Sequence, residues 1–124
     1  MSSRLVAGSV FRAGTVVWAD FGATNGREQS GHRPAIVFVS DDFVDVVHEF
    51  TILIPCTRTD RGWNNHILLT GQTGLVTPTF AMTEQPRTIR TSRIERVLGR
   101  VDSTCLEIIS RWMQVWLPEP ARAH

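Results

Sequence analysis

The chain contains no lysine. All 13 of its basic residues are arginines, and its 12 acidic residues leave a formal net charge of +1 at pH 7. A balance so near neutrality excludes the strong overall field by which very basic proteins attract nucleic acids. The arginine bias fits phosphate binding, because a guanidinium binds phosphate in a bidentate manner, although the base composition of a genome explains the bias more simply.

Long apolar runs and cysteines are also scarce. No stretch approaches the roughly 20 apolar residues that cross a membrane as a helix. The first apolar piece is interrupted by Arg4 and Arg12 and lacks the hydrophobic centre of a signal peptide. Cys56 and Cys105 are too few for a disulfide framework or a zinc site. We expect buried free thiols, as is usual in a cytoplasmic protein.

The common metal, nucleotide and hydrolase motifs are missing as well. The sequence has no GxSxG, P-loop or GxGxxG segment, and its histidines do not show the HExxH spacing of zinc hydrolases. These histidines are His32, His48, His66 and His124. A Ser–His–Asp triad assembled from scattered residues stays open, but nothing favours one. We therefore expect neither a metal nor a cofactor.

Short strands dominate the predicted structure. Segments rich in β-branched and aromatic residues recur between Gly, Pro, Asn and Asp clusters. They cover residues 15–21, 35–40, 50–57, 66–70 and 79–83. This spacing predicts a small barrel or a strongly bent sheet. We expect a single domain over residues 1–124, with a loose N-terminal arm at 1–13 and a C-terminal tail at 118–124.

The final segment changes to a helical period. Apolar residues at Leu106, Ile109, Met113 and Trp116 lie on one face of a helix that Asp102 or Ser103 can cap and Pro118 ends. The stripe is widened by Cys105, Ile108, Trp112 and Val115. We interpret the tryptophans as core residues packed on the sheet, with room for a shared subunit interface. A helical turn near residues 92–96 is also expected.

Polar residues gather where the predicted strands end. Arg33 opens the second strand, Thr57 closes the third, and Glu84-Gln85 follows the fifth. In a small barrel such ends converge on one rim, where they would form a phosphate-compatible pocket. Taken one by one, each residue also fits a surface or capping role.

Five ordered segments then point to a known family. GTVVWADFG, GREQSGHRPAIVFVS, ILIPCTRT, TEQPRTI and LGRVD lie within residues 13–117. The pattern W-x-D-[LF]-x(4)-G-x-E-Q-x-G-x-R-P is complete from Trp18 to Pro34. The chain resembles the MazF/PemK family, the toxin endoribonucleases of type II toxin–antitoxin systems. The order and spacing make this resemblance far more specific than any single segment.

The resemblance implies a fold and an activity. The fold would be mainly β with a C-terminal α-helix, namely an SH3-like small barrel of bent antiparallel strands, as in CcdB and MazF, closed by that helix. The protein would be a cytoplasmic homodimer that cuts single-stranded mRNA at specific sequences without a metal. Attack by a ribose 2′-OH would give a 2′,3′-cyclic phosphate and a 5′-OH. A cognate antitoxin would block the RNA site with an acidic C-terminal segment.

Carried over residue by residue, the resemblance assigns catalysis to Arg33 and Thr57. Arg33 would stabilise charge that develops on the phosphate, and Thr57 would donate a hydrogen bond to it or orient the 2′-OH. Glu84 and His32 are the candidates for proton transfer. The expected RNA-binding residues are Arg27, Glu28, Gln29, Arg58, Thr59, Gln85 and Arg87.

One departure and two alternatives remain. Family members that use an Asp near position 84 carry an Arg two residues earlier, whereas this chain has Met82. That difference favours a mechanism based on Arg33 and Thr57. The main alternative is a CcdB-like toxin that binds a topoisomerase and cuts nothing. A non-catalytic SH3-like binding module, or a toxin with a decayed site, is a third reading, although Arg33 and Thr57 show no lesion.

Overall fold

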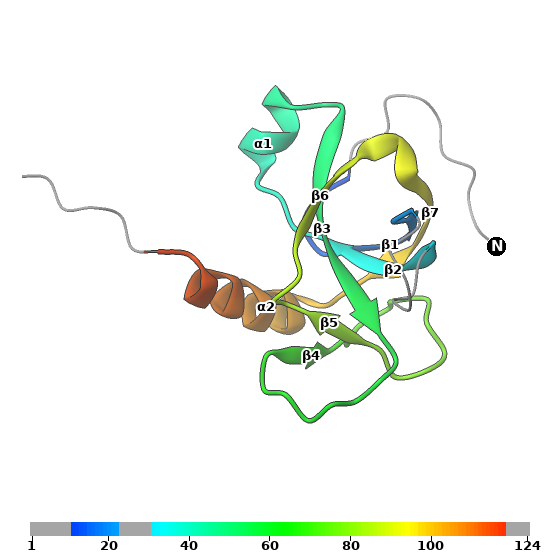
Figure 1. Cartoon of the computed structure of the whole chain (residues 1–124), viewed down its shortest axis with the longest axis vertical. Coiled ribbons are helices and arrows are strands. Elements are labelled where there is room, and N and C mark those ends of the chain that lie inside the picture. Colours follow the sequence, from blue (N-terminus) through cyan, green and yellow to red (C-terminus); the bar gives the residue numbers. More distant parts are fainter. Residues whose placement is uncertain (1–10, 23–30, 119–124) are drawn as a thin grey trace, which may run out of the picture.

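The computed structural model describes residues 11–22 and 31–118. In this part the chain forms seven strands, one 3-10 turn and two α-helices (Figure 1). In chain order these are β1 (Thr15–Asp20), β2 (His32–Val37), α1 (Asp41–Val46), β3 (Phe50–Thr57), β4 (His66–Leu68), β5 (Phe80–Met82), β6 (Arg87–Arg90), η1 (Thr91–Arg93), β7 (Ile94–Arg100) and α2 (Ser103–Trp116).

The strands form one antiparallel, strongly bent sheet. Its order is β4-β5-β3-β2-β1-β7, with β6 pairing beside β3. β3 bends the sheet, because its first half pairs with β6 and its last two residues, Cys56 and Thr57, pair with β5. β1 and β7 pair with register shifts next to Val16 and Trp18, which add local twist. The expected barrel-like architecture is confirmed, although β4 and β7 at its two ends do not pair with each other in the described residues.

Both faces of the sheet are buried. Neighbouring residues of one strand point to opposite faces, and here the two faces carry separate cores. Val17, Val37 and Leu53 belong to one core, while Val16, Ile36 and Ile54 belong to the other. This explains the continuous apolar run after Arg33, since a strand covered on one face only would alternate with polar residues.

α2 covers the second core, as its periodicity predicts. Asp102 caps the helix by accepting a 2.8 Å hydrogen bond from the Cys105 N–H. The helix buries Cys105, Ile109 and Met113 and lies beside β4 (Figure 1). Of the two tryptophans expected in the core, Trp112 packs against it partly buried, whereas Trp116 is exposed. Both cysteines are free and buried. Within the described residues, no helix has the length and apolar character needed to span a membrane.

Several elements differ from the sequence prediction. α1, β6 and β7 were not predicted, and the turn expected near residues 92–96 is η1 followed directly by β7. Of the arm expected at residues 1–13, the structure describes 11–13, and there Phe11 is buried while Arg12 forms a 2.7 Å ion pair with Asp41. Of the expected tail, only Pro118 lies within the described residues.

Candidate active site

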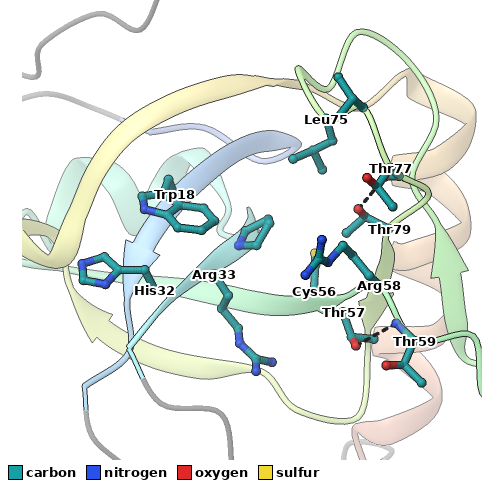
Figure 2. A pocket seen from close by; sticks show the side chains of 12 residues that line it. Trp18, His32, Arg33, Cys56, Thr57, Arg58, Thr59, Leu75, Thr77 and Thr79 are labelled. Carbon is teal, nitrogen blue, oxygen red and sulfur yellow. Dashed lines mark hydrogen bonds between the residues drawn. The ribbon is translucent and has the colours of Figure 1, made fainter.

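A cavity of about 780 Å³ lies where β2 begins and β3 ends. Three parts of the chain surround it (Figure 2). β1 and β2 contribute Trp18, His32, Arg33 and Pro34; the end of β3 contributes Cys56, Thr57, Arg58 and Thr59; the segment before β5 contributes Leu75, Val76, Thr77 and Thr79. The cavity therefore has a basic, hydroxyl-bearing side and a neutral side.

The pairing of β2 with β3 brings Arg33 and Thr57 together. Ala35 pairs with Pro55 in this antiparallel ladder, so the same register continued by two residues sets Arg33 opposite Thr57. Residues two positions apart on a strand share one face, and both side chains line the cavity. The predicted catalytic residues, 24 positions apart in the sequence, thus line one cavity on two paired strands.

Polar groups next to this pair suit a phosphate. Figure 2 shows Arg58 pointing into the cavity from the end of β3. The Thr57 hydroxyl accepts a 3.1 Å hydrogen bond from the Thr59 N–H, and such a hydroxyl keeps its own proton for another partner. Two guanidinium groups and the Thr57 hydroxyl can therefore donate hydrogen bonds to one phosphate group.

The Cys56 thiol lies at the same place but is not a nucleophile. It is buried, and burial raises its pKa far above the ordinary value, an effect that the charge of nearby Arg33 offsets only in part. Because the thiolate is the reactive species, Cys56 is a neutral packing residue beneath the cavity.

His32 is held at the edge of the cavity by a residue that the sequence did not indicate. Its Nε2 lies 2.7 Å from Oε2 of Glu95 on β7, and its ring stacks on Trp18 with centroids 6.2 Å apart. Arg96 covers the Trp18 ring at 5.6 Å. These contacts fix both the position of the imidazole and the ring nitrogen that faces the carboxylate.

Asp20 completes a small cluster with His32 and Glu95, whose ligand-capable atoms all lie within 4.8 Å of one another. Each carboxylate already has protein partners. Glu95 binds His32, while Asp20 accepts a 2.8 Å hydrogen bond from the Gly22 N–H and lies 3.9 Å from Arg93. We interpret these contacts as structural, with His32–Glu95 joining β2 to β7 and Asp20–Arg93 joining β1 to η1.

Glu84, the other candidate for proton transfer, does not line the cavity. Its carboxylate binds His66 Nε2 at 3.0 Å, Asn65 Nδ2 at 2.7 Å and Gln85 Nε2 at 3.1 Å. Burial raises the pKa of the Glu84 carboxyl, but the hydrogen bonds from His66, the backbone and Gln85 outweigh burial, so its pKa lies below the ordinary value. The group is therefore an ionised carboxylate used in local structure.

The expected RNA-binding residues have several locations. Arg58 and Thr59 line the cavity, whereas Gln85 and Arg87 do not. Arg87 instead lies 5.4 Å over the Phe21 ring. Three further positions, Arg27, Glu28 and Gln29, lie outside the described residues.

On the neutral side of the cavity, the sequence indicated only Pro78-Thr79, a departure from the family pattern that bears on cleavage-site choice or loop shape. Sequence reasoning missed the rest of that side, and it missed Glu95. Trp18 was noted only as part of the family pattern. No periodicity or motif marks Leu75, Val76 or Thr77, because only the folded chain brings residues 75–79 opposite Arg33.

Comparisons with known proteins identify the family of the chain. Residues 12–117 match the family model of the PemK-like, MazF-like toxin of type II toxin–antitoxin systems. The endoribonuclease toxin MazF of Escherichia coli (strain K12) is 37% identical over 59 residues, which span 48% of this chain and 52% of that protein. The match thus covers about half the length of this curated relative.

Solved structures share the fold. The crystal structure of MazF (Form-I) from Deinococcus radiodurans has a TM-score of 0.71 at 24% identity and covers 86% of this chain and 96% of that one. MazE-MazF (Form-II) from the same organism has a TM-score of 0.69 at 24% identity, covering 86% and 95%. None of these relatives supports the CcdB-like alternative. Because the family model spans nearly all of the described residues, the chain belongs to the family of PemK-like, MazF-like toxins of type II toxin–antitoxin systems.

Proposed function

We propose that this protein is an endoribonuclease toxin that cleaves single-stranded RNA at the cavity between β2 and β3. The observation that carries the proposal is that Arg33, Thr57 and Arg58 line one cavity at the paired strands β2 and β3. Membership of the toxin family and the endoribonuclease name of the E. coli relative support it.

The proposed reaction is an internal transesterification. The ribose 2′-OH attacks the adjacent phosphorus, a new O–P bond forms, and the bond to the 5′-oxygen of the next nucleotide breaks. Negative charge grows on the nonbridging oxygens as this happens. A guanidinium fixed at that point binds the transition state more tightly than the ground state. Arg33 has this role, and Arg58 adds a second positive charge, so we propose that the reaction needs no metal.

Two proton transfers complete the cleavage reaction. The 2′-OH loses a proton, the leaving 5′-oxygen gains one, and the products are a 2′,3′-cyclic phosphate and a 5′-OH. Thr57 orients the 2′-OH or binds the phosphate. Of the two candidate acid–base groups we favour His32, because it lines the cavity whereas the Glu84 carboxylate is occupied by His66. With Nε2 bound to Glu95, Nδ1 is the atom available to exchange a proton with RNA.

RNA binding extends beyond the cavity in this proposal. Arg58 and Thr59 contact the backbone near the scissile phosphate. Arg27, Glu28 and Gln29 lie outside the described residues, and we propose on the family resemblance alone that they contact the same strand of RNA. Gln85 and Arg87, outside the cavity, would contact more distant nucleotides.

The partners of the proposal are a second copy of the chain and an acidic antitoxin, both in the cytoplasm. Apolar side chains remain exposed near the end of α2, among them Val115, Trp116 and Leu117. Contiguous surface of this kind is typical of an interface, and we propose that the second copy covers it. An acidic antitoxin segment would bind Arg33 and Arg58 in place of phosphate. The MazE-MazF complex from D. radiodurans supports such a partner.

The decisive experiment incubates the purified protein with a long single-stranded RNA in buffer containing EDTA. We expect fragments that end in 2′,3′-cyclic phosphate and begin with 5′-OH, identified by mass spectrometry. Intact RNA would contradict the proposed activity, while 5′-phosphate ends or inhibition by EDTA would contradict the mechanism. Sedimentation at micromolar concentration tests the dimer, and a monomer that still cleaves RNA would refute it.

A further inference from the structure

The neutral side of the cavity is formed by the segment between β4 and β5, residues 69–79. Leu75, Val76, Thr77 and Thr79 face the cavity from this segment. Figure 2 shows Leu75, Thr77 and Thr79 across the cavity from Arg33. The segment, LTGQTGLVTPT, contains no charged residue, so it offers nothing that would compete with the arginines for a phosphate.

Glycines allow this segment to lie directly on the backbone of β7. A Cβ atom added to Gly74, whose φ is +75°, would lie 2.1 Å from the Leu98 carbonyl oxygen. One added to Gly99 would lie 2.2 Å from the Gln72 carbonyl oxygen. Real Cβ atoms do not approach so closely, so these contacts require glycine on both sides. The segment is therefore packed backbone against backbone.

Hydrogen bonds fix both ends of the same segment. On one side the Arg100 N–H donates to the Gln72 carbonyl at 2.8 Å. On the other the Leu69 N–H donates to the Thr79 carbonyl at 2.9 Å. The Thr79 hydroxyl, which is buried, donates to the Thr77 carbonyl at 2.8 Å. The backbone of residues 75–78 is consequently held in place from both sides, which determines where their side chains meet the cavity.

Val76 is the exception within this ordered segment. Its side chain is fully exposed, at 101% of the reference area, while it also lines the cavity. The β-branched side chain of valine is restricted at χ1, and the backbone of this segment is fixed by the contacts described above. An exposed apolar side chain on a fixed backbone, in the same cavity as Arg33 and Arg58, is suited to contact with the uncharged surface of a nucleobase.

We propose that residues 75–79 form a fixed wall that selects the nucleobase next to the scissile phosphate, with Val76 as the residue that contacts the base. This inference rests on the proposed ribonuclease function and adds the part of the site that determines specificity. When Arg33 and Arg58 hold the phosphate, the attached base extends across the cavity to the neutral side. Apolar contact there strengthens binding of the base that fits. Bases whose polar edges would be left unpaired bind less tightly.

The test compares cleavage preferences of the full chain and its Val76 variants. Short RNAs carrying every combination of bases on the two sides of the mapped cleavage site serve as substrates. In Val76→Ala we expect kcat/KM for the preferred base to fall about tenfold at one flanking position. The other bases at that position should change little, so the preference flattens. Val76→Ile, which keeps the branched apolar surface, should retain the preference.

Val46→Ala is the matched control, because Val46 is also exposed, at 80%, but lies on α1 and does not line the cavity. Its preference should equal that of the wild type. An unchanged preference in Val76→Ala would overturn this inference and leave the ribonuclease proposal standing. Intact RNA with the wild-type protein would overturn both. Gly74→Ala should flatten the preference more strongly, and if it fails to fold, Val76→Ala still decides.

Discussion

Both carboxylate oxygens of Glu84 lie 3.0 Å from the buried Nε2 of His66. Asn65 and Gln85 donate to the same carboxylate, and the Trp63 ring covers His66 with centroids 4.8 Å apart. The pair therefore links the start of β4 to the turn after β5. Its role is to hold these two strands together, which gives a motif residue of the family a structural function in this chain.

Replacing Glu84 by Gln should make the free energy of unfolding less dependent on pH in the acid range. The folded-state pKa of Glu84 lies below the unfolded value, so the carboxylate stabilises the fold above about pH 4.5 and this contribution is lost as pH falls through the folded pKa. At pH 7 we expect Glu84→Gln to lose about 1–2 kcal/mol. The difference from wild type should shrink below pH 4.5, measured by urea unfolding across pH.

Glu49→Gln provides the control, because Glu49 is exposed and lies 3.7 Å from exposed Arg90. Such a pair contributes about 0–1 kcal/mol. A difference between Glu84→Gln and wild type that stays constant from pH 7 to strong acid would show that the carboxylate is not the stabilising group.

Truncating either member of the proposed catalytic pair should abolish most RNA cleavage. Arg33→Ala removes the charge nearest the phosphate and Thr57→Ala removes one hydrogen bond, and losing such a transition-state donor costs about a hundredfold to a thousandfold in kcat. Thermal unfolding should show that both variants fold. Arg90→Ala, at an exposed arginine paired with Glu49, should cleave normally. Near-normal cleavage by Arg33→Ala would remove that residue from the mechanism.

His32 and Glu95 should behave as a functional pair. His32→Ala removes the proposed proton-transfer group, and general acid–base catalysis contributes roughly a hundredfold to ten-thousandfold. Imidazole added to the buffer should restore part of the activity, which it would not do if His32 only packed against Trp18. Glu95→Gln keeps a hydrogen-bond acceptor and should lose less kcat than His32→Ala. Failure of imidazole at every concentration, with a folded variant, would assign proton transfer to another group.

Met82→Arg should destabilise the protein without increasing its activity. The position corresponds to an arginine in other family members, but here the Met82 side chain is buried and pairs across the sheet with His66. A charge placed there would lack solvent, so we expect a loss of at least about 3 kcal/mol in the free energy of unfolding. Met82→Leu conserves volume and should lose less than about 1.5 kcal/mol. A large gain in cleavage by Met82→Arg would instead favour the mechanism based on an arginine and an acid.

The strands that the sequence predicted are those with buried β-branched residues, such as β1 and β3. β6 and β7 were missed because their segment is rich in arginine and resembles a solvated surface. β7 buries only Ile94 fully, and its pairing with β1 is a long-range contact. α1 was missed because it has six residues and none is buried. Its local signals are a capping bond from the Phe43 N–H to Ser40 Oγ and two acidic residues in the first turn.

Sequence similarity indicated Arg33 and Thr57, and the register of β2 with β3 shows how they meet. The same reasoning placed Glu84 on their rim, and there the geometry differs. Phe80, at the start of β5, pairs with Thr57, whereas Met82, at the end of β5, pairs with His66. Glu84 follows that end of the strand and therefore lies away from Thr57. Glu95 and Val76 carried no local signal, since only the folded chain brings Glu95 to His32 and Val76 to the cavity.

Thr57 lies on β3, a strand that resists local unfolding. The strand pairs with β2, β5 and β6 and contributes Leu53 to one core and Ile54 to the other. It cannot separate from its neighbours unless both cores open together. Amide hydrogens along β3 should therefore exchange with solvent only when the whole sheet unfolds. The proposed catalytic hydroxyl would then keep its place for as long as the molecule is folded at all.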